Sequence, residues 1–215
     1  MDYRKDYIMR MIHMVGDLMR RLFERMDDQE RRRLLSQACL EHCGMSLSAG
    51  ETLETESLLE MLAPIPRLMM SELLFAKAET CELPVGDGDL LRRKALNLLA
   101  SLYDQPQLCD LRTQRLIDLK AGLLPALTAP ELMDCARFFA QAERYDEMED
   151  ALYQALERET GAERERDRAR AAALLRAAAR ASEHTLALCR MTSRELRESA
   201  RELEGEAADN THEQE

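Results

Sequence analysis

Apolar residues recur at steps of three and four along most of the chain, which is the period of an amphipathic α-helix. The clearest run comes first, and its apolar positions are Ile8, Ile12, Val15, Met19, Leu22 and Met26. Asp27, with Glu30 three residues later, forms a capping-box pattern, so a second helix is predicted from there to Gly44. The two segments together predict a helical hairpin.

The middle of the chain alternates between periodic runs and breaks that contain glycine or proline. Residues 44–55 include two glycines and show little periodicity, so they predict a loop. Further helices are predicted over residues 56–63, 66–81, 90–103, 108–122, 132–142 and 145–159. Thr128 and Glu131 supply a second capping box, and the short connection between the last two helices indicates an antiparallel pair.

The last third of the chain, from Ala162, is rich in arginine, glutamate and alanine, with a narrow stripe of small and apolar residues. Thr192 and Glu195 form a third capping box, which predicts a break followed by a final helix. From Gly205 the sequence is polar, so residues 205–215 are predicted to be a disordered tail.

The predicted hairpin over residues 132–159 resembles a tetratricopeptide repeat, a helical hairpin that recurs every ~34 residues. Its matching positions are Leu132, Cys135, Ala136 and Phe139 in the first helix, and Tyr145, Met148, Leu152, Ala155 and Leu156 in the second. The turn glycine of that repeat is replaced by Glu143 and its closing proline by Thr160. A weaker copy lies over residues 66–104, so degenerate repeats are predicted.

The predicted fold class is therefore all-α: antiparallel, tetratricopeptide-like hairpins in a compact right-handed helical array. We predict a single domain over residues 1–204. Its parts are N-terminal helices (1–63), tetratricopeptide-like hairpins (64–160) and C-terminal helices (161–204).

Three short motifs carry a resemblance to a known family. They are Asp6-Tyr-Ile-Met-Arg-Met-Ile12, Lys94-Ala-Leu-Asn-Leu98 and Arg144-Tyr-Asp-Glu-Met-Glu-Asp-Ala-Leu-Tyr153. In this order they resemble an uncharacterised family of helical proteins from Firmicutes-type bacteria with tetratricopeptide-like hairpins. The resemblance spans nearly the whole chain, and the Ala/Arg-rich stretch around residues 164–180 departs from it. It implies a helical fold and a bacterial source, and it implies no activity, cofactor or catalytic residue.

The net charge and the composition argue against some classes of partner. The net charge of -11 would repel a phosphate backbone, so no nucleic-acid partner is predicted. Charged residues interrupt every apolar run near the N-terminus, and no segment offers the ~20 apolar residues of a membrane span. We therefore expect a cytoplasmic protein with no membrane partner. The six cysteines lack the dense spacing of a secreted scaffold, so they are interpreted as reduced core thiols.

One group of side chains could hold a metal ion. Cys39, His42 and Cys43 lie at i, i+3 and i+4 on one predicted helix face, with Cys81 as a conceivable fourth ligand. The alternative, which we favour, is two packed thiols and a histidine at a helix end, because structural zinc sites usually draw ligands from knuckle turns. The chain contains no phosphate-loop, dinucleotide, nucleophile-elbow or metalloprotease motif, so no catalytic residue and no cofactor are predicted.

A partner-binding strip is predicted on the helix over residues 132–142. Met133, Arg137 and Gln141 step by four along the side away from its core positions, which predicts one exposed strip. An arginine between a methionine and a glutamine suits a peptide that carries an acid and an apolar anchor. The alternatives are plain solvent exposure or burial under the neighbouring C-terminal helix.

These patterns favour a non-enzymatic helical module that holds a protein or peptide partner, as a monomer or a homodimer. Two other hypotheses stay open: a structural homo-oligomer, and a metal- or thiol-dependent enzyme that uses Cys39, His42 and Cys43.

Overall fold

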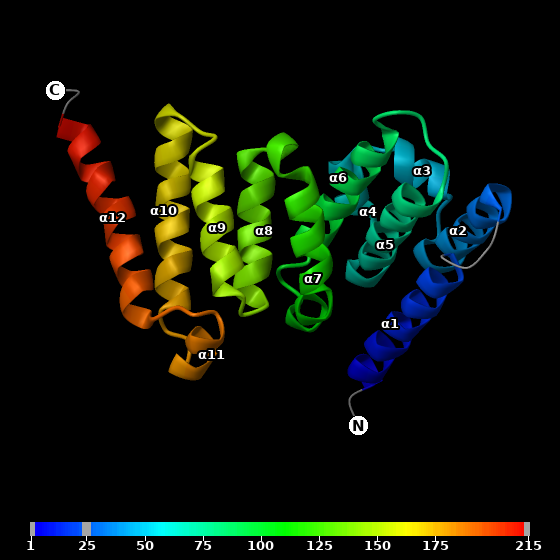
Figure 1. Cartoon of the computed structure of the whole chain (residues 1–215), viewed down its shortest axis with the longest axis horizontal. Coiled ribbons are helices and arrows are strands. Elements are labelled where there is room, and N and C mark those ends of the chain that lie inside the picture. Colours follow the sequence, from blue (N-terminus) through cyan, green and yellow to red (C-terminus); the bar gives the residue numbers. More distant parts are fainter. Residues whose placement is uncertain (1–2, 23–26, 213–215) are drawn as a thin grey trace. The chain divides into compact units, whose positions relative to one another are not determined.

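A computed structural model describes the backbone of residues 3–22 and 27–212, and the side chains of residues 9–10, 13–14, 16–22 and 27–205. The regular elements of this described part are all helical, which confirms the predicted fold class. In chain order (Figure 1) they are α1 (Tyr3–Leu22), α2 (Asp28–Cys43), α3 (Leu47–Thr52), α4 (Thr55–Met61), α5 (Pro64–Thr80), α6 (Asp87–Ala100), α7 (Pro106–Leu123), the 3-10 turn η1 (Leu124–Ala126), α8 (Ala129–Gln141), α9 (Tyr145–Leu156), α10 (Gly161–Ala178), α11 (Glu183–Leu188) and α12 (Ser193–His212).

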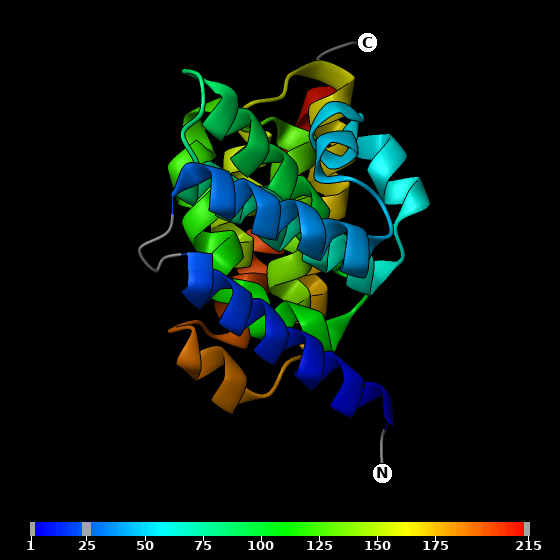
Figure 2. The ribbon, with the colours of Figure 1, turned by 90° about the vertical axis from the view of Figure 1, so that its right-hand side faces the viewer.

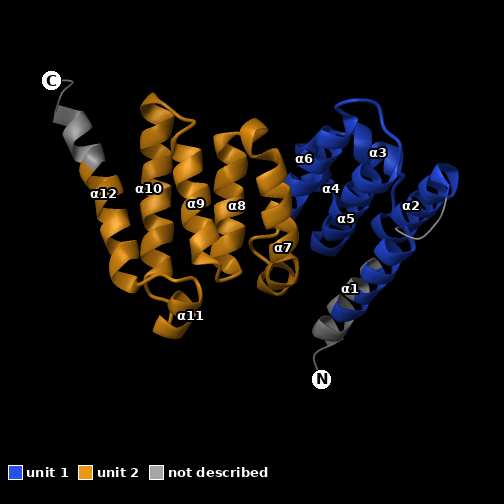
Figure 3. Cartoon of the chain, in the orientation of Figure 1, with its two compact units in different colours: residues 1–99 blue, residues 100–215 orange. Residues whose placement is uncertain are grey.

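The chain divides into two compact units, unit 1 over residues 1–99 and unit 2 over residues 100–215, coloured separately in Figure 3. The sequence predicts one domain over residues 1–204, and its apolar pattern continues through the boundary without a linker. The division therefore rests on which helices pack together, which periodicity alone does not specify.

In unit 1, α5 is the central helix, and α1, α2 and α3 all pack against it. Leu68, Met70 and Leu74 of α5 are fully or almost fully buried, as expected for a helix covered on several sides. Leu22 of α1 is also fully buried, whereas the side chains of Ile8, Ile12, Val15 and Met26 from the predicted stripe lie outside the described residues. Figure 2 shows α1 and α2 side by side in this unit.

The predicted loop over residues 44–55 contains a helix, so that prediction is wrong over Leu47–Thr52. Ser46 caps α3 by accepting a hydrogen bond from the backbone N–H of Ala49 at 3.1 Å. At its other end, Lys94 Nζ donates to the carbonyl oxygens of Glu51 and Leu53, both at 2.6 Å. Contacts from α6, far along the sequence, thus stabilise a helix too short and too rich in glycine and serine to form on its own.

In unit 2, α8 and α9 form the predicted antiparallel hairpin, α7 and α10 pack against it, and α12 packs against α10. Both predicted capping boxes are present: Thr128 N donates to Glu131 Oε2 at 2.8 Å, and Thr192 N donates to Glu195 Oε2 at 2.8 Å. Glu143, in the turn between α8 and α9, has φ 54°, the left-handed conformation that usually favours glycine.

The C-terminal helices differ from the prediction in two places. α11 forms a separate short helix, because Ser182 caps it by accepting a hydrogen bond from the N–H of Thr185 at 3.1 Å. α12 continues to His212, so the prediction of a disordered tail from Gly205 is wrong up to that residue, while residues 213–215 lie outside the described part. Glutamate and alanine just beyond Gly205 are strong helix formers, which explains the continuation.

Searched over the described residues, no helix combines the length and the apolar character that a membrane span requires.

Candidate binding grooves

Each unit contains a groove whose lining comes from facing helices. The groove of unit 2, the α8–α10 groove, has a volume of about 370 Å³, within the range of small-ligand sites. Its lining residues are Tyr103, Arg137, Ala140, Gln141, Tyr145, Leu174, Ala177 and Ala178. Both helices contribute residues at i, i+3 and i+4, so one face of α8 lies opposite one face of α10.

The lining of the α8–α10 groove combines small residues with large ones. Ala140, Ala177 and Ala178 lack side chains beyond Cβ, and such residues let a ligand backbone approach a helix closely. Tyr145, at the first residue of α9, is only 7% exposed, and this burial raises the pKa of its hydroxyl above the ordinary value. Tyr103, which precedes α7, is 38% exposed. The two phenol rings give the groove large, rigid contact surfaces.

Arg137 is held in place from two sides. Its Nη1 lies 2.9 Å from Asp134 Oδ1, one turn earlier on α8, and its guanidinium lies 5.4 Å from the centre of the Tyr103 ring. Burial raises the pKa of Asp134, and the positive charge of Arg137 opposes that shift. The arginine side chain stays 35% exposed, so its remaining N–H groups can donate to a ligand oxygen.

The structure separates the three residues of the predicted strip. Arg137 and Gln141 line the α8–α10 groove, but Met133 is only 3% exposed, so its predicted exposure is wrong. The reason is that α8 packs against α7, α9 and α10 and is therefore buried on more sides than a two-helix hairpin implies. That Arg137 and Gln141 bind a partner stays a prediction.

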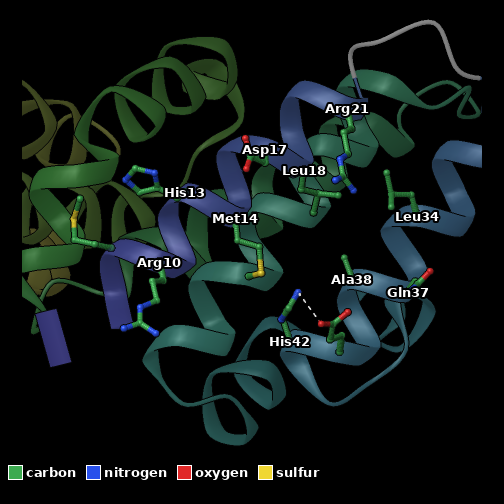
Figure 4. Close-up of a pocket in the computed structure, with 12 residues that line it drawn as sticks. Arg10, His13, Met14, Asp17, Leu18, Arg21, Leu34, Gln37, Ala38 and His42 are labelled. Carbon is green, nitrogen blue, oxygen red and sulfur yellow. Dashed lines mark ion pairs between the residues drawn. The ribbon is translucent and has the colours of Figure 1, made fainter. Parts of the chain in front are cut away.

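The groove of unit 1, the α1–α2 groove, is larger, at about 850 Å³. It is shown in Figure 4, where Met14 and Leu18 of α1 and Leu34 of α2 lie around the space between the two helices. These three side chains are half-buried, and Ala38 beside them is buried. Charged and polar residues surround this apolar floor: Arg10, His13, Asp17, Arg21, Gln37, Glu41 and His42.

The candidate metal ligands on α2 point in different directions. Cys39 Sγ lies 4.0 Å from Met70 Sδ and Cys43 Sγ donates to the carbonyl of Pro66 at 3.5 Å, so both thiols face α5. His42 lines the α1–α2 groove instead, 3.9 Å from Glu41. Within the described residues, no group of three or more His, Cys, Asp or Glu side chains could hold a metal ion.

The hydrogen bond between the two thiols lowers the pKa of Cys39 and raises that of Cys43. The pair is packed in the core, with Cys39 fully buried, so the geometry supports the packing alternative over the metal site.

Sequence reasoning misses the α10 side of the α8–α10 groove and Tyr103 altogether. Leu174 and Ala177 belong to the Ala/Arg-rich stretch, whose amphipathic pattern is weak, and Tyr103 lies more than thirty positions before Arg137. A cation–π contact across such a separation leaves no local signal in the sequence.

Comparison with known proteins adds no relative: no protein-family model, no curated protein and no solved structure matches the chain. The resemblance to the Firmicutes-type family therefore stays a prediction.

Proposed function

We propose that this protein is a non-enzymatic helical interaction module, and that the α8–α10 groove binds a short peptide segment of a partner protein. The observation that supports this most is the placement of Arg137, a half-exposed guanidinium fixed between Asp134 and Tyr103 in a groove that three alanines also line. Because its position is already set, little side-chain entropy is lost when it binds a ligand.

The ligand chemistry follows from the lining. Leu174, the two tyrosine rings and the three alanines offer apolar surface to a ligand side chain. A carboxylate beside it accepts hydrogen bonds from Arg137, since a guanidinium has five N–H donors and Asp134 accepts from one of its nitrogens. Gln141, exposed at the end of α8, offers both a donor and an acceptor to the peptide backbone. The proposed ligand is therefore a peptide with an acidic residue next to an apolar anchor.

The experiment is a selection of random peptides on the full chain, followed by titration of the enriched sequences. We expect enrichment of an acid beside an apolar residue, and an affinity loss of about tenfold or more in Arg137→Glu. Arg166→Glu is the matched control, because Arg166 forms the same i,i+3 ion pair, with Glu163, in the same unit but outside the groove. The control should change the affinity by less than about twofold.

Folding is checked in the same samples. Exposed ion pairs contribute about 0–1 kcal/mol, so both variants should melt within about 4 °C of the parent protein. The proposal fails if no peptide is enriched, or if Arg137→Glu and Arg166→Glu bind the enriched peptides equally well.

A further inference from the structure

Tyr145 places a hydroxyl in the α8–α10 groove that the described part of the fold does not use. The residue is only 7% exposed, yet its hydroxyl forms no hydrogen bond with any described residue. Side chains buried to this extent usually have their polar atoms paired. The hydroxyl oxygen stays accessible to water, which is its partner in the free protein.

A ligand that fills the groove removes that water. Because Tyr145 lines the groove, a bound ligand must offer the hydroxyl a new partner or leave it unpaired, and an unpaired buried hydroxyl weakens binding. Gln141 is in a similar position, since its side-chain amide lines the same groove and pairs with no described residue. The groove therefore favours a ligand that carries hydrogen-bonding groups besides the carboxylate that pairs with Arg137.

The groove is short along both of its main helices. On α8 its lining runs from Arg137 to Gln141, and on α10 it runs from Leu174 to Ala178, four steps in each case. Four steps of a helix cover about 6 Å. A helical ligand in a groove uses anchors from i to i+7, which span about 10 Å. Two residues of an extended chain span about 7 Å, so the length of the groove suits an extended segment better.

The free hydrogen-bonding groups favour the same conformation. The backbone N–H and C=O groups of a helical ligand are paired with one another, whereas those of an extended segment need partners when water is excluded. Both the amide of Gln141 and the hydroxyl of Tyr145 can donate and accept. Burial raises the pKa of Tyr145, so its hydroxyl keeps the proton that it donates.

We propose that the α8–α10 groove binds its peptide in an extended conformation, and that the Tyr145 hydroxyl donates a hydrogen bond to a backbone carbonyl of that peptide. This inference rests on the proposed function, to which it adds the conformation of the ligand and a residue that selects it. Tyr145 discriminates between two peptides with the same side chains, because only the extended one has a free carbonyl for the hydroxyl.

The test uses the tightest peptide from the selection, titrated against the full chain. Tyr145→Phe removes the hydroxyl and keeps the ring, so we expect an affinity loss of about tenfold and an unchanged melting temperature. Tyr153→Phe is the matched control, because it removes a hydroxyl from the same helix, α9, outside the groove. The control should change the affinity by less than about twofold.

A second measurement identifies the carbonyl. In a series of peptides, each backbone amide in turn is replaced by an ester, whose carbonyl is a weaker acceptor. One ester should bind the parent protein about tenfold more weakly than the amide peptide does, and this loss should largely disappear in Tyr145→Phe. The difference circular dichroism spectrum of the complex should show no gain of helix.

The outcomes separate this inference from the proposed function. Binding that is weakened by Arg137→Glu but not by Tyr145→Phe, or a gain of helix on binding, overturns the inference and leaves the proposed function standing. Binding that does not depend on Arg137 overturns both. A clear fall in the melting temperature of Tyr145→Phe also overturns the inference, since the hydroxyl would then have a partner within the fold.

Discussion

The two grooves differ in how their arginines are held. In the α8–α10 groove, Arg137 is paired with Asp134 and stacked over Tyr103, and its surroundings are rigid rings and alanines. In the α1–α2 groove, Arg10 and Arg21 form no ion pair among the described residues, and the floor is made of flexible methionine and leucine side chains.

The two grooves therefore differ in how firmly their side chains are held before any ligand binds. A guanidinium already oriented by its neighbours discriminates by hydrogen-bond geometry, so it suits a short peptide with one well-placed carboxylate. The methionine and leucine side chains beside Arg10 and Arg21 can change conformation, so the shape of the α1–α2 groove is less fixed. Variants that disturb the packing around one groove and leave the other groove unchanged test this difference.

The largest loss of stability is expected when the ion pair between Lys120 of α7 and Glu147 of α9 is broken. Lys120 Nζ lies 2.9 Å from Glu147 Oε2 and 5.3 Å from the centre of the Phe139 ring, and the lysine side chain is only 7% exposed. Glu147→Ala leaves this ammonium group buried without its carboxylate, which should lower the free energy of unfolding by about 3–5 kcal/mol in urea titrations.

A double variant controls for the lost volume. Replacing both partners, in Lys120→Met/Glu147→Leu, removes the charges together and should recover most of the lost stability. Glu147→Ala should also weaken peptide binding at the α8–α10 groove, because Lys120 contacts Phe139 of α8. An unchanged peptide affinity in Glu147→Ala would show that this groove does not depend on the ion pair.

A smaller loss of stability is expected from a substitution at Gly50 of α3, in unit 1. A Cβ atom there would lie 2.5 Å from Sδ of Met70, a fully buried side chain that also contacts Cys39 of α2. Gly50→Ala must therefore displace the end of the Met70 side chain within a filled core, at a cost of about 1–3 kcal/mol. Gly122→Ala on α7, where a Cβ meets no atom within 4 Å, should leave the stability unchanged or slightly higher. A Gly50→Ala protein as stable as the parent would contradict the packing described for unit 1.

The smallest effect is a difference in thiol reactivity, with no change in stability. Cys81 in unit 1 is half-buried, while the other five cysteines are buried. In unit 2, burial raises the pKa of Cys109 to about 12 and that of Cys135 as well.

Brief treatment of the native protein with N-ethylmaleimide, followed by peptide mass mapping, should therefore modify Cys81 first. Burial also raises the pKa of Cys81, so its rate should still be increasing at about pH 9, where an ordinary thiol is already mostly ionised. Faster labelling of Cys109 or Cys135 than of Cys81 would show that unit 2 opens more readily than its packing indicates.

The sequence predicts those helices whose limits are encoded locally. The capping boxes at Thr128 and Thr192 are formed by side chains three residues apart, and both are present in the structure. By contrast, the sequence pattern misses α3, because the stability of this helix depends on Lys94 and Lys77, which reach Glu51 from α6 and α5. The spacing of apolar residues along the chain carries no information about such long-range contacts.

The binding residues are predictable only in part, for the same reason. Steps of four place Met133, Arg137 and Gln141 on one face of α8, but the number of helices that cover that face depends on the tertiary fold. Met133 is covered, whereas Arg137 and Gln141 are not. Periodicity assigns the half-exposed apolar side chains of the α1–α2 groove to the core, because a stripe of methionine and leucine looks the same whether a neighbouring helix belongs to the chain or to a partner.

The proposed binding of a short acidic and apolar peptide at the α8–α10 groove is tested most directly by hydrogen–deuterium exchange of the full protein with the selected peptide. The peptide should protect backbone amides of residues 137–145 and 174–178, and it should leave the exchange of residues 9–21 and 34–42 in unit 1 unchanged. Protection of residues 9–21 or 34–42 instead, or of neither groove, would contradict the proposal.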